Sequence, residues 1–241
     1  MQKGIIFSII LILAIAIGVV LIVSKQGNKP DDSITKNISQ TTSQDIGGQT
    51  TLKDTIENSN EPSATLADGI YSIDIINSKI KWFCVIHKGY VLLKSGKITI
   101  EDNKITKGSF EILMDSIVDI DIDYYLMKAT LENTLKSNMF FDVRKYPESV
   151  FKITGVTDKG DNRYLINGDL KIKDIVKPVS FISTITIKND TLYAKSERFS
   201  INRTVWGITI YSKNYPQTDD SFLFTDYIDF VITLVMTKEG E

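Results

Sequence analysis

The 241-residue sequence predicts an all-β domain, an antiparallel eight-stranded β-barrel with one helix, behind an N-terminal transmembrane helix and a disordered stalk. Three observations predict this fold class. Strand-length runs that alternate apolar and polar residues recur along the C-terminal two thirds of the chain, short turns rich in Gly, Asn and Asp separate them, and a single segment has helical spacing. Closing such a meander into a barrel removes its exposed edges.

The first element is an uncharged run over residues 5–23, in which fifteen of the side chains are Ile, Leu, Val or Phe. A helix of this length spans about 28 Å, close to the roughly 30 Å hydrocarbon core of a bilayer. A cleaved signal peptide is the alternative, but no small-x-small cleavage site follows Val23. We therefore expect residues 1–24 to anchor the chain in a membrane, with the following domain on the extracytoplasmic (periplasmic) side.

The second element is a polar stretch over residues 25–66, dominated by Ser, Thr, Asn, Gln, Asp and Gly. Such a composition cannot bury enough apolar surface to offset the entropy of ordering the backbone. We expect a disordered linker that holds the domain near the membrane surface.

The third element is the β-rich domain, expected over residues 67–241. Alternation of apolar and polar residues marks six strand runs, which begin at Tyr71, Ile80, Phe110, Tyr164, Val179 and Ile228. The first run extends to Ile75 and the second to Cys84. Between such runs lie turns at 102–103, 159–162 and 188–190, whose Asn, Asp and Gly residues tolerate left-handed backbone.

One helix of about fourteen residues interrupts the strands. Asp123 is a candidate N-cap, and Tyr124, Met127, Leu131 and Leu135 recur at helical spacing. We expect this apolar stripe to cover the barrel mouth or wall; a partner-binding helix is the alternative.

Composition excludes several classes of function. The formal net charge is −2, and Lys and Arg form no cluster that would follow a phosphate backbone, so nucleic acid is not an expected partner. The single cysteine, Cys84, cannot form an internal disulfide and is expected to be a small buried hydrophobe.

Residues that could carry chemistry are few. The only histidine, His87, precedes a Gly in an expected turn, where a structural or solvated role is commoner than catalysis. Acidic residues at Asp115, Asp119, Asp121 and Asp123 lack the Gly and terminal Glu of an EF-hand, so we expect a solvated acidic loop with weak cation affinity. The sequence therefore predicts no catalytic residue, no cofactor and no metal site.

Several motifs resemble the YceI-like family, whose members are similar to lipocalins in shape and bind long apolar lipids. The segment LKSNMFFDVRKYP over 135–147 resembles the LKS–FFDV–KYP signature of that family, and GDLKIKDIVKPV over 168–179 resembles its GDLTIKGxxKPV run. Shorter matches in the family order are HKG at 87–89, DSI at 115–117 and RTVWGI at 203–208. The resemblance implies a barrel that holds a polyisoprenoid, a quinone-like molecule or a fatty acyl chain.

Alternation alone fits a filled core and a lined cavity equally well. With the resemblance, the expected function is sequestration or transfer of such a lipid, and the alternatives are a packed-barrel envelope module and an enzyme acting on the lipid through His87. A homodimer is left open. The residues expected to line the cavity are Phe110, Ile112, Phe151, Ile153, Ile166, Leu170, Phe181, Ile185, Phe199 and Trp206, a choice that a one-residue register error would overturn strand by strand.

Overall fold

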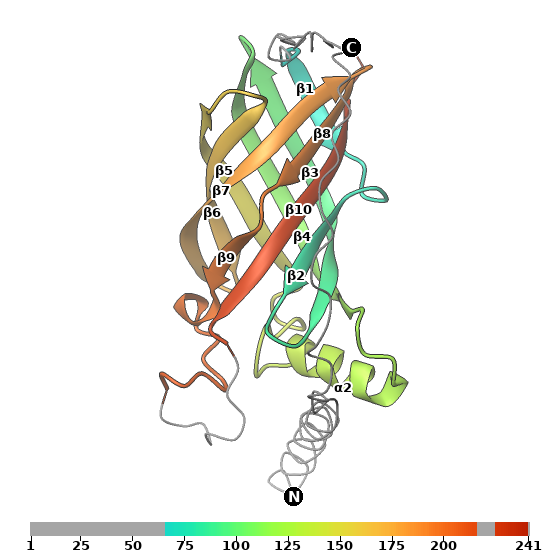
Figure 1. The fold of residues 1–241 in the computed structure, drawn as a ribbon, viewed down its shortest axis with the longest axis vertical. Helices are drawn as coiled ribbons and strands as arrows, with labels where there is room; N and C mark the ends of the chain where they lie inside the picture. The colour runs from blue at the N-terminus through green and yellow to red at the C-terminus, as the bar shows by residue number, and fades with distance from the viewer. Residues whose placement is uncertain (1–65, 216–224, 241) are drawn as a thin grey trace, which may run out of the picture.

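The strands form one antiparallel sheet that closes into a ring, with alternate side chains facing its inside, and a helix lies across one end of the ring (Figure 1). The computed structural model describes residues 66–215 and 225–240. Within them the elements are, in chain order, β1 Gly69–Ile73, β2 Lys79–Phe83, β3 Lys88–Glu101, β4 Lys104–Asp119, α2 Tyr125–Lys136, β5 Glu148–Asp158, β6 Arg163–Ile172, β7 Ile175–Lys188, β8 Thr191–Ser196, β9 Phe199–Asn202, the 3₁₀ turn η1 Arg203–Trp206, and β10 Tyr227–Lys238.

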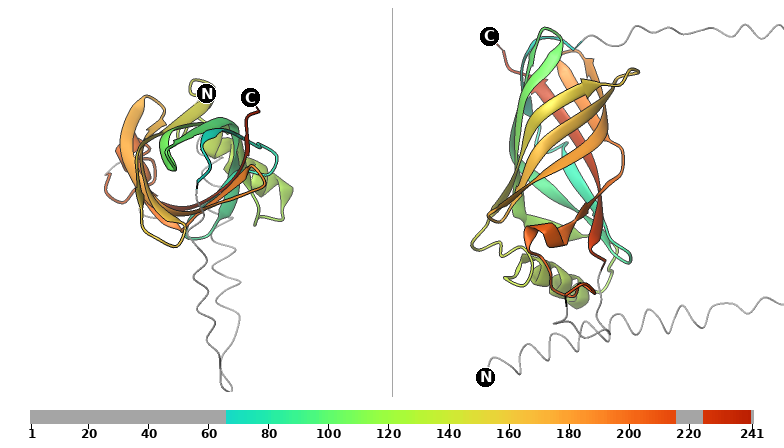
Figure 2. Two further views of the ribbon diagram at one scale, coloured as in Figure 1. Left: turned by 90° about the horizontal axis from the view of Figure 1, so that it is seen from above. Right: turned by 90° about the vertical axis from the view of Figure 1, so that its left-hand side faces the viewer.

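The ring closes through β10, as the view down the barrel in Figure 2 shows. On one side β10 pairs with two short strands, β1 and β2, which lie end to end along it. Both short strands pair with β3 on their other side. On its other side β10 pairs with β8 and then with β9. The expected eight-stranded barrel is therefore corrected to ten strands in the described part of the chain, because two of the eight positions around the ring are each filled by two short strands.

Three hairpin turns have the backbone that their residues predict. Positive φ angles occur at Asp102 and Asn103, at Asn189 and Asp190, and at residues 160–162. Side chains of Asn and Asp tolerate this left-handed region better than most, and two successive positive φ angles match the right-handed twist of paired strands. The three expected turns are confirmed.

Strand β3 departs from simple alternation. Its pairing with β4 shifts register between Tyr90 and Leu92 and again between Leu93 and Ser95. Before the second shift the buried side chains include Val91 and Leu93, and after it Ile98 and Ile100. A bulge therefore exchanges the inward and outward faces of this strand, which hides its periodicity in the sequence.

The helix α2 begins at Tyr125, and its N-cap is Tyr124, which makes no side-chain capping bond. The expected N-cap, Asp123, is therefore wrong, and the helix has 12 residues instead of about fourteen. Leu131 is its buried residue, and α2 lies next to β4 across the end of the barrel (Figure 2). This end of the molecule is called the helix end below.

The opposite end of the barrel is filled by side chains. Tyr71, Ile100, Leu192 and Met236 are almost completely buried there. Ile75, expected to extend the first strand, lies beyond β1 and is exposed. Leu66 is 3% exposed and packs in the core, so the folded domain begins at least one residue before the expected boundary at 67.

The expected anchor over 5–23 and nearly all of the expected linker lie outside the described residues. Within 66–215 and 225–240, no helix is both long enough and apolar enough to cross a bilayer.

Candidate ligand-binding cavity

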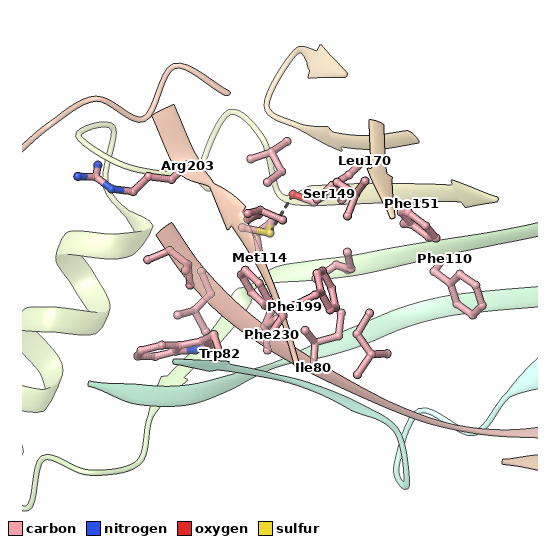
Figure 3. Close-up of a pocket in the computed structure, with 18 of the residues that line it drawn as sticks. Ile80, Trp82, Phe110, Met114, Ser149, Phe151, Leu170, Phe199, Arg203 and Phe230 are labelled. Atoms are coloured by element: carbon pink, nitrogen blue, oxygen red, sulfur yellow. Dashed lines mark hydrogen bonds between the residues drawn. The ribbon is translucent and has the colours of Figure 1, made fainter. Parts of the chain in front are cut away.

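The barrel interior holds an elongated cavity of about 250 Å³ with an almost wholly apolar wall (Figure 3). This volume is just below the roughly 300–1,000 Å³ found for small-molecule pockets. Nine of the ten side chains expected from alternation lie on the wall: Phe110, Ile112, Phe151, Ile153, Ile166, Leu170, Phe181, Ile185 and Phe199. That any of them contacts a ligand stays a prediction.

Trp206 is the exception, and its expected place on the wall is wrong. It lies in η1 with 2% of its surface exposed, in a second apolar cluster with Phe140, Ile208 and Tyr211. Its indole Nε1 donates a hydrogen bond to the carbonyl oxygen of Leu170, 3.1 Å away. The short 3₁₀ turn breaks the strand alternation on which the expectation depended, and the indole is used to join η1 to β6.

Four phenylalanine rings form a row across the wall. Phe151 on β5 packs against Phe181 on β7, with ring centroids 5.7 Å apart, and Phe181 stacks on Phe199 of β9 at 4.6 Å. Phe199 in turn lies 6.0 Å from Phe230 of β10. Aromatic pairs at these distances gain about 0.5–1.5 kcal/mol beyond burial of area. The row links β7 to β9, which are not hydrogen-bonded to each other in the sheet.

Several wall residues escape prediction from the sequence. Val91, Leu93 and Ile98 belong to β3, whose bulges conceal the alternation. Leu131 and Leu135 reach the cavity from α2, in agreement with the expectation that their apolar stripe covers the barrel mouth or wall. The helix therefore forms part of the cavity wall at the helix end.

Ser149 and Arg203 are among the few polar side chains on the apolar wall. The hydroxyl of Ser149 donates to the sulfur of Met114 at 3.1 Å, which satisfies this buried group (Figure 3). Arg203 is nearly buried at the helix end and donates from Nε to the carbonyl of Thr225, and from Nη1 to those of Ile208 and Ile210, at 2.8–3.0 Å.

Arg203 also lies beside a buried carboxylate. Its Nη2 is 3.5 Å from Oδ1 of Asp226, and Asp226 accepts a hydrogen bond from the side chain of Asn214. Burial lowers the pKa of the Arg203 guanidinium from its usual value, and the negative charge of Asp226 opposes that shift. These contacts brace the loop that follows η1, so the main role of Arg203 is structural.

The single histidine meets two acidic residues at the helix end. His87 lies on the cavity wall, and its Nδ1 faces the carboxylates of Asp119 and Asp121. Asp119 is completely buried, so the expectation of a solvated acidic loop is wrong for this residue. Burial raises the pKa of the Asp119 carboxyl, and the negative charge of the neighbouring Asp121 raises it further.

The one cysteine is a poor nucleophile in this setting. The Cys84 thiol donates to the backbone carbonyl of His87 at 3.3 Å and not to its imidazole. Burial raises the pKa of this thiol, so the thiolate is scarce at neutral pH.

The wall as a whole is suited to enclosing an apolar molecule, and its few polar groups mainly make contacts that stabilise the structure.

Comparison with known proteins agrees with this architecture. Residues 71–235 match the YceI-like domain. Similar curated proteins include UPF0312 proteins of Vibrio parahaemolyticus, 29% identical over 104 residues that cover 41% of this chain and 52% of the relative, and of Vibrio cholerae, 30% identical over 100 residues with 40% and 52% covered. The chain thus spans about half the length of the curated relatives it matches.

Two solved structures have a similar fold. Burkholderia cenocepacia BcnA superposes with a TM-score of 0.55 at 18% identity, covering 68% of this chain and 98% of that one. A polyisoprenoid-binding domain from Saccharophagus degradans, implicated in plant cell wall breakdown, gives a TM-score of 0.50 at 10% identity, covering 70% and 98%. At these identities the likeness concerns the fold.

Proposed function

Because the chain belongs to the YceI-like domain family, we propose that it is a lipid-binding protein that encloses one long apolar chain in its barrel. The observation that carries the proposal is the elongated cavity with an almost wholly apolar wall. A polyisoprenoid or quinone-like chain is the preferred ligand, and a fatty acyl chain is the second choice. The structural similarity to a polyisoprenoid-binding domain supports this order.

Hydrophobic burial is sufficient for binding. Each buried methylene contributes roughly 0.8 kcal/mol, so a five-carbon isoprenoid unit contributes about 3–4 kcal/mol before the cost of ordering the ligand. Micromolar affinity requires about 8 kcal/mol, so without an ionic contact at least three enclosed units are needed, which contribute about 9–12 kcal/mol before that cost. The phenylalanine row adds an aromatic surface against which the methyl branches of an isoprenoid could pack.

The setting that we propose is the extracytoplasmic face of a membrane. The apolar run over residues 5–23 would tether the domain, and the polar stretch over 25–66 would let it move along the surface. In this setting the barrel would sequester a membrane lipid or carry it to another acceptor. No bond chemistry is required.

A packed-barrel module without a ligand is the second candidate. It would require side chains to fill the interior, as they do around Tyr71 and Met236. The remaining length of the barrel holds the cavity instead, and side chains such as Phe181 and Phe230 are only partly buried. The cavity therefore favours the carrier.

The test is to fill the cavity. Ala194 on β8 lies on the wall, and the adjacent Lys195 is exposed on the outside of the same strand. We expect Ala194→Phe to weaken binding of a fluorescent polyene or isoprenoid probe at least tenfold, whereas Lys195→Phe leaves it unchanged. Both variants should keep the far-ultraviolet circular dichroism of the wild type. Equal binding by a folded Ala194→Phe variant would contradict the proposal.

A further inference from the structure

Three potential metal ligands meet at the helix end of the barrel. His87 comes from the turn between β2 and β3, Asp119 is the last residue of β4, and Asp121 follows two residues later. The Nδ1 atom of His87 lies 3.8 Å from Oδ2 of Asp119 and 3.5 Å from Oδ1 of Asp121. All three ligand atoms lie within 4.8 Å of one another. Strand pairing produces the cluster, because Gly89 lies opposite Asp119 in the β3–β4 ladder.

Two of these atoms are buried without a hydrogen-bond partner. Asp119 is 0% exposed; its Oδ1 accepts the backbone N–H groups of Asp121 and Ile122 at 3.1 and 2.8 Å, but its Oδ2 has no partner. Nδ1 of His87 is also unpartnered. A buried carboxylate oxygen without a partner is costly, so an orphan oxygen that faces an orphan nitrogen indicates a missing component.

The spacing distinguishes a metal ion from a direct ion pair. A charge-assisted hydrogen bond would bring nitrogen and oxygen to about 2.7–2.9 Å. Two ligands on a tetrahedral Zn²⁺ are instead about 3.4 Å apart, because each bond is roughly 2.1 Å long. The observed separations of 3.8 and 3.5 Å are close to the second value. We propose that His87, Asp119 and Asp121 bind one divalent transition-metal ion, with water in the fourth position.

The donor set favours Zn²⁺ over Ca²⁺ or Mg²⁺. One imidazole nitrogen and two carboxylate oxygens suit a borderline-soft ion. Hard cations take six or more oxygen ligands, and the cluster offers three groups, one of them nitrogen.

The surrounding contacts show what the ion would do. The two backbone N–H groups that bind Oδ1 of Asp119 fix the carboxylate, as outer contacts do in known metal sites. The backbone N–H of Asp119 also donates to Oε1 of Glu132 on α2 at 2.9 Å. A bound ion would therefore join the β2–β3 turn to the end of β4, and through Glu132 to the helix that forms part of the cavity wall. Metal binding does not depend on the proposed lipid.

The experiment is a zinc titration of the full chain, purified with a histidine-free tag and stripped with a chelator. His87 is the only histidine, so any histidine signal reports this site. We expect one Zn²⁺ per chain in competition with a chromophoric chelator, protection of His87 from diethylpyrocarbonate by Zn²⁺, and visible absorption bands of tetrahedral type with Co²⁺. His87→Gln and Asp119→Asn should each weaken the affinity at least tenfold.

The matched control is Asp123→Asn, a change in the same loop but outside the cluster. It should bind Zn²⁺ like the wild type. His87 lies in a partly exposed turn, so His87→Gln should fold even if Asp119→Asn does not. The proposal is overturned if the wild type binds no stoichiometric Zn²⁺ at micromolar concentration, or if a folded His87→Gln variant binds it as tightly.

Discussion

At the scale of single residues, the wall of the cavity depends on glycines that lie beneath aromatic rings. A Cβ atom at Gly168 on β6 would lie 2.2 Å from Cζ of Phe151 and 2.6 Å from the carbonyl oxygen of Lys152. A Cβ at Gly89 would lie 2.4 Å from the indole of Trp82 and 1.9 Å from the carbonyl oxygen of Val118. The missing side chains therefore let large rings lie flat along the inside of the barrel.

We expect Gly168→Ala to lower the free energy of unfolding by about 1–3 kcal/mol, because the methyl group would collide with fixed backbone as well as with a ring. Gly155→Ala, on the adjoining strand β5, is the control, since a Cβ there would have nothing within 4 Å. Its effect should stay within about 0.5 kcal/mol. Urea unfolding followed by circular dichroism measures both. Equal stabilities of the two variants would show that Phe151 is not held as described.

At the scale of elements, the sequence predicts some strands much better than others. Alternation and turn residues locate β4, β6, β7 and β10, and nine of the ten chosen side chains lie on the cavity wall. The alternation of strand β3 is not recognised in the sequence, because its bulges exchange the side chains that face inward and outward. The cluster of His87 with Asp119 cannot be predicted from the sequence, because the two residues are 32 positions apart and come together only through the pairing of β3 with β4. Local pattern carries no information about such contacts.

The helix end also exposes an unusual number of apolar side chains. The exposed apolar side chains of the β2–β3 turn, of the segment before α2 and of the first turn of α2 are Val85, Ile86, Ile120, Tyr124, Tyr125 and Leu126. Exposed apolar groups that gather at one end of a domain mark a contact surface. The β2–β3 turn and the start of α2 lie at the same end of the barrel (Figure 1), where α2 forms part of the cavity wall, so we expect the lipid to exchange with the membrane there.

Accordingly, Val85→Asp combined with Tyr125→Asp should slow uptake of lipid from vesicles at least tenfold, because two apolar contacts with the bilayer are replaced by charge. Val85 and Tyr125 are 83% and 75% exposed, so folding should not suffer. The control is Ile76→Asp in the β1–β2 turn, where the side chain is 85% exposed but distant from the helix end. Equal slowing by the control would exclude a specific exchange site.

At the scale of the whole molecule, buried side chains fill one end of the barrel, and the other end carries the helix α2, the contacts of Arg203 and the proposed metal site. At the first end Tyr71, Ile100, Leu192 and Met236 are almost completely buried. Arg203 and α2 form the structure of the helix end, and the cavity lies inside the barrel between its two ends. This asymmetry fits the proposal of a lipid container that is loaded from one end and tethered by the expected anchor to the membrane that supplies its ligand.

The most direct measurement is to identify what the barrel carries. The full chain, expressed in a membrane-bearing host and purified, would be extracted with organic solvent and analysed by mass spectrometry beside its Ala194→Phe variant. We expect about one polyisoprenoid, quinone-like or acyl lipid per chain in the wild type and a strongly reduced amount in the variant. A wild-type extract without stoichiometric lipid, together with no uptake of added isoprenoids, would contradict the account.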